Sequence, residues 1–162
     1  MSKDKFIKVG CEAFICRGDK ILLGKRGNVY GSGTWALPGG HLEYLERADE
    51  CLKRELFEEM GLELDNVKFT LISLCDDLQV ENNVHYIHIT FAVDIGTQEP
   101  QLLEPEACEE WRWFDLKNIP ENIFPPHKKI FDTISKDDII VTLGIQPSRP
   151  DTRSEERRVG KE

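Results

Sequence analysis

The sequence predicts a single domain of the mixed α/β (or α+β) class, in which strands surround one long helix. The chain has 162 residues, and about 100–200 residues is the usual size of one domain. Several short segments rich in Val, Ile and Phe indicate strands, whereas one long segment, residues 47–60, has a helical period. Hydrophobic residues make up 40% of the chain and charged residues 31%, a balance typical of folded domains that excludes a disordered chain.

Five segments are strand candidates because Val, Ile, Phe or Trp is frequent in them and turn residues separate them. In chain order they are residues 6–16, 20–26, 67–78, 84–95 and 110–115, and residues 35–37 form a further short apolar stretch. The first two form a hairpin around Gly18, and residues 81–83 form the turn between residues 67–78 and 84–95. The sequence Pro38-Gly39-Gly40 ends the apolar stretch at residues 35–37.

Two helices and one helical turn complete the predicted elements. Residues 47–60 have the 3.6-residue period, and Gly61 suits the left-handed position that ends a helix. Residues 116–119 are predicted to form one helical turn before a proline. Residues 127–135 are predicted to form the last helix, which follows two prolines.

We expect the folded domain to occupy residues 1–145 and a disordered tail to occupy residues 146–162. Residues 146–152 are rich in Pro and Ser, and residues 153–162 are almost all charged. The last ten residues resemble the translation of a common sequencing adaptor. We therefore expect residues 153–162 not to be native sequence, and exclude them from the prediction of the fold.

Charge and cysteine content exclude several classes of protein. The formal net charge is −9, whereas a general nucleic-acid binder carries a basic face, so no nucleic-acid polymer is expected as a partner.

The chain has no run of about 18 apolar residues, and residues 1–5 lack the features of a signal peptide. The five cysteines are odd in number and have no C-x-x-C spacing, which favours reduced thiols. We expect a cytoplasmic protein without a membrane partner.

The long helix carries acidic residues where a helix that packs on a core should be apolar. On a helical wheel, Glu55 and Glu59 lie in the middle of the apolar face and Glu58 flanks it. Glu55 and Glu59 also repel each other as like charges four residues apart. Desolvated carboxylates without a partner are costly, so we expect a divalent cation with oxygen ligands, such as Mg²⁺, to neutralise them. An unusual structural cluster of acids is the alternative.

The helix belongs to a longer motif. Gly40 is followed after five residues by Glu46, and after seven more by the run RELFEEMGL at residues 54–62. This segment resembles the Nudix box, G-x5-E-x7-R-E-U-x-E-E-x-G-U with U aliphatic, at every fixed position. Residues 37–40 (LPGG) resemble the usual lead-in, although Leu45 stands where many members have Gly. The looser resemblance, from Lys8 to about Ser135, implies a Nudix hydrolase of the MutT-like group, with an α/β/α sandwich around a mixed β-sheet.

The resemblance also implies roles for residues of the motif. Glu55, Glu58 and Glu59 match carboxylates that hold Mg²⁺ or Mn²⁺, and the carbonyl of Gly39 matches a backbone ligand of the metal. Glu55 or Glu58 is also implied to position the attacking water. Arg54 matches the arginine that orients these carboxylates.

Residues outside the motif are implied to contact the substrate. Arg26 matches a basic residue that touches substrate phosphates, and Leu37 and Gly39 are further substrate-binding candidates. A glutamate from a later loop often serves as base or metal ligand in the family. We choose Glu106 over Glu104 for this role, with an ordinary loop acid as the alternative. Phe124 is a candidate for stacking on the base, with a place in the core as its alternative.

The implied activity is metal-dependent hydrolysis of a nucleoside triphosphate to the monophosphate and pyrophosphate, in the service of nucleotide pool sanitation. The marker Pro or Tyr of subfamilies for ADP-ribose or diadenosine polyphosphates is missing between Leu62 and Tyr86. Relatives that recognise oxidised guanine use Asn or acidic residues where Ala36 and Pro126-His127-Lys128 stand here. The sequence therefore does not decide whether 8-oxo-dGTP is a substrate. The alternatives are another nucleoside diphosphate derivative (ADP-ribose or a sugar nucleotide) and a non-catalytic nucleotide sensor. The oligomeric state, including a homodimer, is also open.

Overall fold

The structure, a computed structural model, describes residues 5–134. Its elements, in chain order, are β1 (Ile7–Arg17), β2 (Lys20–Arg26), β3 (Trp35–Ala36), β4 (Gly39–His41), α1 (Ala48–Met60), β5 (Phe69–Gln79), the 3₁₀ helix η1 (Val80–Asn82), β6 (Val84–Val93), β7 (Cys108–Asp115) and α2 (Pro125–Thr133). The predicted tail at residues 146–162 lies outside the described residues. The expected domain boundary at residue 145 therefore stays a prediction.

The sheet is mixed, as the sequence predicts. Its strands follow the order β3-β2-β1-β6-β5, while β4 pairs with β1 and β7 pairs with β2 outside this path. β1 runs parallel to β6, and the other paired strands are antiparallel. The hairpin of β1 and β2 is closed at Gly18, which has a φ of +61° and so adopts the left-handed conformation that glycine tolerates best.

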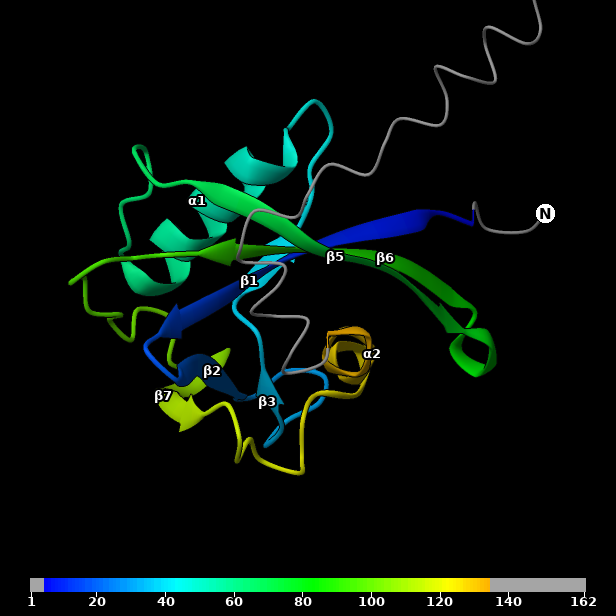
Figure 1. The fold of residues 1–162 in the computed structure, drawn as a ribbon. Helices are drawn as coiled ribbons and strands as arrows, with labels where there is room; N and C mark the ends of the chain where they lie inside the picture. Colours follow the sequence, from blue (N-terminus) through cyan, green and yellow to red (C-terminus); the bar gives the residue numbers. More distant parts are fainter. Residues whose placement is uncertain (1–4, 135–162) are drawn as a thin grey trace, which may run out of the picture.

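The two helices cover opposite faces of the sheet (Figure 1). Side chains alternate between the faces of a strand, and in β1 the residues Cys11, Ala13 and Ile15 pack in one core together with α1. Phe14 points to the other face and packs in a second core with Ile130 of α2. The result is the predicted α/β/α arrangement, with β1 in the middle.

The boundaries of α1 agree with the prediction to within one residue. The backbone N–H of Arg47 donates to Glu50 Oε2 at 3.0 Å just before the helix, and Gly61 ends it with a φ of +70°. The apolar side of α1 is fully buried and consists of Cys51, Leu52, Leu56 and Met60. Within residues 5–134, no helix is long and apolar enough to cross a membrane.

Three local predictions differ from the structure. Residues 38–40 were expected only to end the apolar stretch at 35–37, but residues 39–41 form β4, with Gly40 opposite Cys11 of β1. Gly39, with a φ of +151°, lies so close to the Cys11 carbonyl that a side chain would not fit, so the glycines permit this pairing. Residues 116–119 form a turn rather than helix, and α2 begins two residues earlier than predicted.

Candidate active site

Arg54 organises the acidic side of α1. Its guanidinium contacts Glu46 through two hydrogen bonds, Nε to Oε2 at 2.7 Å and Nη2 to Oε1 at 2.9 Å. Nη1 donates to Glu55 Oε1 at 2.7 Å and lies 3.7 Å from Glu58 Oε2. Paired hydrogen bonds of this kind fix geometry as well as charge. They hold the pKa of Glu46 at about 2 and orient the carboxylates that follow along the helix.

Glu55 and Glu59 carry more negative charge than the surrounding protein groups neutralise. Burial raises the pKa of Glu55, and Glu58 and Glu104 add to this although Arg54 opposes it. Burial also raises the pKa of Glu59 well above its usual value, and the charges of Glu55 and Glu104 act in the same direction. Partly buried carboxylates that raise one another's pKa in this way suit a hard divalent cation. The donor set therefore fits the predicted metal.

The glycine pair before the helix allows a close approach to these carboxylates. A side chain on Gly40 would overlap the carboxylate of Glu55, so glycine is required at this position. The Gly39 backbone hydrogen bonds to Glu59 and favours its ionised form. The main chain of residues 39–40 therefore forms part of the site itself.

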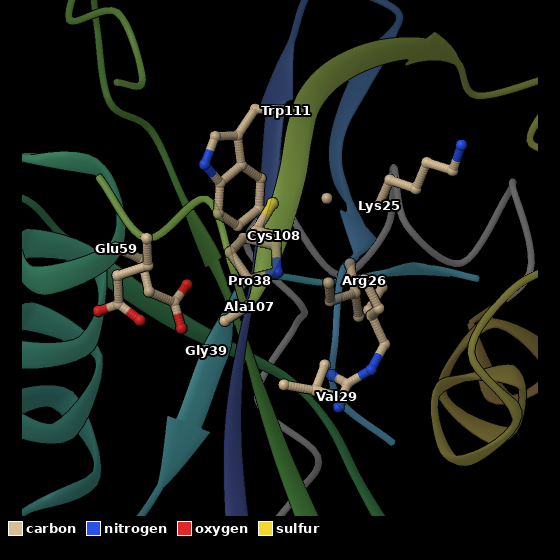
Figure 2. A pocket seen from close by; sticks show the side chains of 13 residues that line it. Lys25, Arg26, Val29, Pro38, Gly39, Glu59, Ala107, Cys108 and Trp111 are labelled. Carbon is tan, nitrogen blue, oxygen red and sulfur yellow. The ribbon is translucent and has the colours of Figure 1, made fainter. Parts of the chain in front are cut away.

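Glu59 lies across a cavity of about 150 Å³ from Arg26 (Figure 2). Figure 2 shows its carboxylate on one side of the cavity, with Lys25 and Arg26 on the other. The Nε of Arg26 donates to the Tyr30 carbonyl at 2.7 Å, and its guanidinium lies 4.0 Å from the centre of the Phe124 ring. A polyanion that enters this cavity meets a guanidinium on one side and carboxylates able to hold a cation on the other.

Of the two loop glutamates, the structure brings Glu104 to the cavity. Glu104 lines it together with Glu59 and contributes to the raised pKa of Glu59. Glu106 is exposed, and its backbone carbonyl accepts the N–H of Asn28 at 2.7 Å. Among the described residues, Glu106 does not line this cavity or the one beside it. The geometry therefore favours Glu104 over the residue chosen from the sequence.

A second cavity, of about 280 Å³, adjoins the first and shares Arg26, Leu37 and Gly39 with it. Its remaining lining residues are Gly10, Glu12, Tyr30, Gly40, His41, Tyr86, His88, Phe124, Pro126 and His127. All the predicted substrate-binding residues thus lie around two adjoining cavities. Phe124 is 8% exposed and contributes both to the wall of the cavity and to the protein interior.

Three residues of the second cavity, Glu12, His88 and His127, were given no role from the sequence, although His127 stands where relatives place residues near the base. Glu12 Oε1 lies 2.7 Å from His88 Nδ1 and 3.5 Å from His127 Nε2, and all three side chains are buried. Their ligand atoms lie within 4.8 Å of one another, close enough to share a metal ion. One sequence signal was available, because Glu12 is a charged residue within the apolar run of β1.

The NUDIX domain family matches residues 8–134, most of the chain. The chain is a Nudix hydrolase. This Nudix hydrolase is 36% identical over 124 residues to the ADP-ribose pyrophosphatase of Methanocaldococcus jannaschii, a match that covers 76% of the chain and 71% of the relative. It is 31% identical over 109 residues to the oxidized purine nucleoside triphosphate hydrolase of Danio rerio, covering 62% of each.

A solved structure supports the same grouping. The MutT NUDIX hydrolase from Burkholderia pseudomallei is 30% identical, with a TM-score of 0.72, and the match covers 80% of this chain and 99% of that one. The predicted fold and the MutT-like grouping are confirmed. The named relatives differ in their substrates, so the substrate of this Nudix hydrolase is a separate question.

Proposed function

We propose that this Nudix hydrolase converts a nucleoside triphosphate, either a dNTP or a modified dNTP, to the monophosphate and pyrophosphate with Mg²⁺ or Mn²⁺. One observation carries the proposal: Glu59 and Glu104 line a cavity whose opposite side presents Arg26. The likeness to the oxidized purine nucleoside triphosphate hydrolase supports this substrate class. The role would be nucleotide pool sanitation in the cytoplasm.

Glu55, Glu58 and Glu59, with the carbonyl of Gly39, are the groups proposed to hold the cation. A divalent cation bound there would offset the negative charge of the phosphates and favour hydroxide as the nucleophile near neutral pH. Arg54 contributes by holding Glu55 at 2.7 Å and by lying 3.7 Å from Glu58, which limits the movement of both carboxylates.

Other side chains of the site bind the substrate and orient the water. Arg26 is proposed to bind the phosphates, because its guanidinium borders both cavities. Leu37 and Phe124 border the second cavity and are proposed to hold the base. Glu55, Glu58 and Glu104 are the candidates for accepting a proton from the attacking water, with Glu104 in the place first given to Glu106. Positioning of this kind contributes much of the rate in phosphoryl transfer.

ADP-ribose is a second candidate substrate, and one finding favours it. The relative named ADP-ribose pyrophosphatase is 36% identical over 124 residues, and the chain covers 71% of its length. Hydrolysis of ADP-ribose also breaks a phosphoric anhydride, so the proposed metal ligands would serve both reactions. The two candidates therefore differ in the second cavity rather than at the carboxylates.

Product analysis on a panel of nucleotides tests the reaction. Wild type is incubated with Mg²⁺ and each of the four dNTPs, 8-oxo-dGTP, ADP-ribose and diadenosine tetraphosphate, while pyrophosphate, phosphate and nucleoside monophosphate are quantified. We expect pyrophosphate and monophosphate from at least one triphosphate, and no turnover in EDTA. Glu59→Gln should lower kcat by about 100-fold or more, because it removes a charge from the cluster that holds the cation.

Glu63→Gln is the matched control, because Glu63 is exposed and lies just beyond α1. It should leave turnover at the wild-type rate. Turnover of ADP-ribose alone would contradict the proposed substrate while leaving the metal site in place. Turnover of triphosphates by Glu59→Gln at the wild-type rate would contradict the assignment of the carboxylates.

A further inference from the structure

The side of the sheet that α1 packs against extends beyond α1. On β5, Leu71, Leu74 and Leu78 point to this side, whereas Cys75 points toward α2 and packs in the second core. The three leucines are members of neither core, and each is more than half exposed. Figure 1 shows β5 and β6 continuing past α1 toward η1. This end of the sheet is therefore covered on the side of α2 and open on the side of α1.

The open area continues from β5 onto β6 and β1. Ile87 and Ile89 of β6 are half-buried, and Ile89 is the register partner of Leu74, so both point to the same side of the sheet. Ile7 of β1 is more than half exposed and lies in the same cross-strand row as Leu78. We call the surface formed by these side chains the open face, which consists of Ile7, Leu71, Leu74, Leu78, Ile87 and Ile89.

The apolar surface here is large enough for an interface between proteins. Phe6 and Val80, both more than half exposed, line a groove of about 480 Å³ together with Ile7 and Leu78. With these two residues, the open face presents roughly 600 Å² of apolar surface, the upper limit for a typical monomer, whose largest patch is about 300–600 Å². A standard interface buries about 800 Å² per partner, of which about 60% is apolar. The open face and its groove supply that apolar part.

The edge of the sheet beside the open face is also unprotected. Among residues 5–134, β5 pairs with β6 alone, so the backbone groups on its outer side have no strand partner there. Exposed edges are usually kept short or are protected by lysine, proline or a covering element. β5 is 11 residues long and contains neither lysine nor proline. The edge and the open face therefore form one surface suited to a partner chain.

The charges around the open face suit a second copy of this chain. Within the face, Asp76 Oδ1 lies 3.5 Å from His85 Nε2. Lys68 is exposed just before β5, and Glu81 is exposed just after it. A two-fold axis that reverses β5 brings the Lys68 end of each copy to the Glu81 end of the other. The surface is thus complementary to itself, as a symmetric dimer requires.

We propose that two copies of this chain associate through the open face and the outer edge of β5 in a symmetric homodimer. Tyr86 and His88 line the second cavity. Because side chains alternate along a strand, these two residues point to the opposite side of β6 from Ile87 and Ile89. The dimer therefore leaves the cavities of both copies accessible. The inference is independent of the substrate that the cavities bind.

Sedimentation equilibrium of the full chain tests the assembly. Interfaces of this size have Kd values of about 1 μM or lower, so wild type at about 100 μM should have twice the chain mass of 18.7 kDa. Leu74→Asp should raise the Kd at least about 100-fold, because it places an unpaired carboxylate in an apolar interface. Tyr44→Asp is the matched control. Tyr44 is even more exposed than Leu74 but lies between β4 and α1, outside the open face, so the Kd should not change.

Monomeric wild type at this concentration would overturn the inference, and so would a Leu74→Asp protein that dimerises as tightly as wild type. Hydrogen–deuterium exchange of wild type decides the question even where Leu74→Asp fails to fold. The amides of β5 should exchange several-fold more slowly in the dimer than in the monomer obtained by dilution. Equal exchange in both states would contradict the proposed interface. Slow exchange of β5 in a protein that is monomeric throughout would assign the open face to the chain's own residues 135–162 instead.

Discussion

Leu45 occupies a backbone conformation that disfavours its side chain. Its φ is +62°, in the left-handed region, and the residue is 87% exposed. Left-handed backbone costs about 1–2 kcal/mol for a non-glycine residue. Because the Leu45 side chain is exposed, its packing offsets little of this energy. The turn continues with a hydrogen bond from the N–H of Glu43 to Glu46 Oε1 at 3.2 Å. The residue that carries strain is therefore next to Glu46, the partner of Arg54.

Leu45→Gly should stabilise the protein. The strain energy that glycine removes is larger than the free energy lost because glycine increases the conformational entropy of the unfolded chain. We therefore expect a gain of about 0.5–1 kcal/mol in the free energy of unfolding. Thermal and urea unfolding measure this gain. Gly61→Ala serves for comparison, because Gly61 has a φ of +70° and alanine there should cost about 1 kcal/mol. A Leu45→Gly protein that melts below wild type would refute this account of the turn.

At the scale of the element, α1 combines a fully apolar side with carboxylates that repel one another. Cys51, Leu52 and Leu56 are fully buried, so packing keeps the helix in place. Glu55 and Glu59 lie one helical turn apart. The charge of Glu58 raises the pKa of Glu55, and the charge of Glu55 raises the pKa of Glu59. A raised carboxyl pKa means that the ionised form destabilises the fold near neutral pH. The buried, mutually repelling carboxylates of α1 therefore lower the stability of the fold, and the same carboxylates form the proposed cation site.

Glu59→Gln should therefore melt no lower than wild type in EDTA. The amide resembles the protonated carboxyl and removes a like-charge repulsion, for a gain of about 0.2–0.5 kcal/mol from the Glu55 pair alone. Mg²⁺ at 100 times its Kd should stabilise wild type by about 2.7 kcal/mol, or about 5–10 °C at about 2–4 °C per kcal/mol. The shift should be much smaller in Glu59→Gln, and thermal unfolding with and without Mg²⁺ measures it.

Two outcomes would count against this account of α1. One is a Glu59→Gln protein much less stable than wild type in EDTA, which would make Glu59 a structural residue. The other is an equal Mg²⁺ shift in both proteins. Glu63→Gln, outside the cluster, should respond to Mg²⁺ as wild type does.

At the scale of the whole molecule, one buried polar network joins elements that are far apart in the chain. It links Glu12 of β1 to His88 of β6, Asp77 of β5, and His127 and Lys129 of α2. Tyr86 stacks on the His88 ring at 5.6 Å between ring centres. The network therefore attaches α2 to the same strands that line the second cavity.

The network should make stability depend on pH through His88. Burial alone lowers the pKa of His88, but its hydrogen bonds to Glu12 and Asp77 raise it overall above the ordinary value of 6.5. A raised histidine pKa contributes stability that is fully present below about pH 6.5 and is lost as pH rises through the folded-state value. The difference in unfolding free energy between wild type and His88→Gln should shrink from about pH 6 to about pH 9. Denaturant unfolding measures it, and a constant difference would contradict the prediction.

The order of residues alone was enough to predict the family, the mixed sheet, the extent of α1 and the carboxylates on it. These features depend on residues close together in the chain, because the Nudix box lies within residues 40–62 and the helical period places its glutamates on one face. The turn at Gly18 and the end of α1 at Gly61 were predictable for the same reason, since both depend on local backbone conformation.

Which further groups line the site follows from how the elements pack together. The loop sequence does not fix which of Glu104 and Glu106 returns to the carboxylates, because that depends on how β7 pairs with β2. Glu12 and His88 are 76 residues apart in the chain, and their contact follows from the parallel pairing of β1 with β6. Local patterns specify elements and their faces, whereas contacts between distant elements arise only when the sheet and its two helices are assembled.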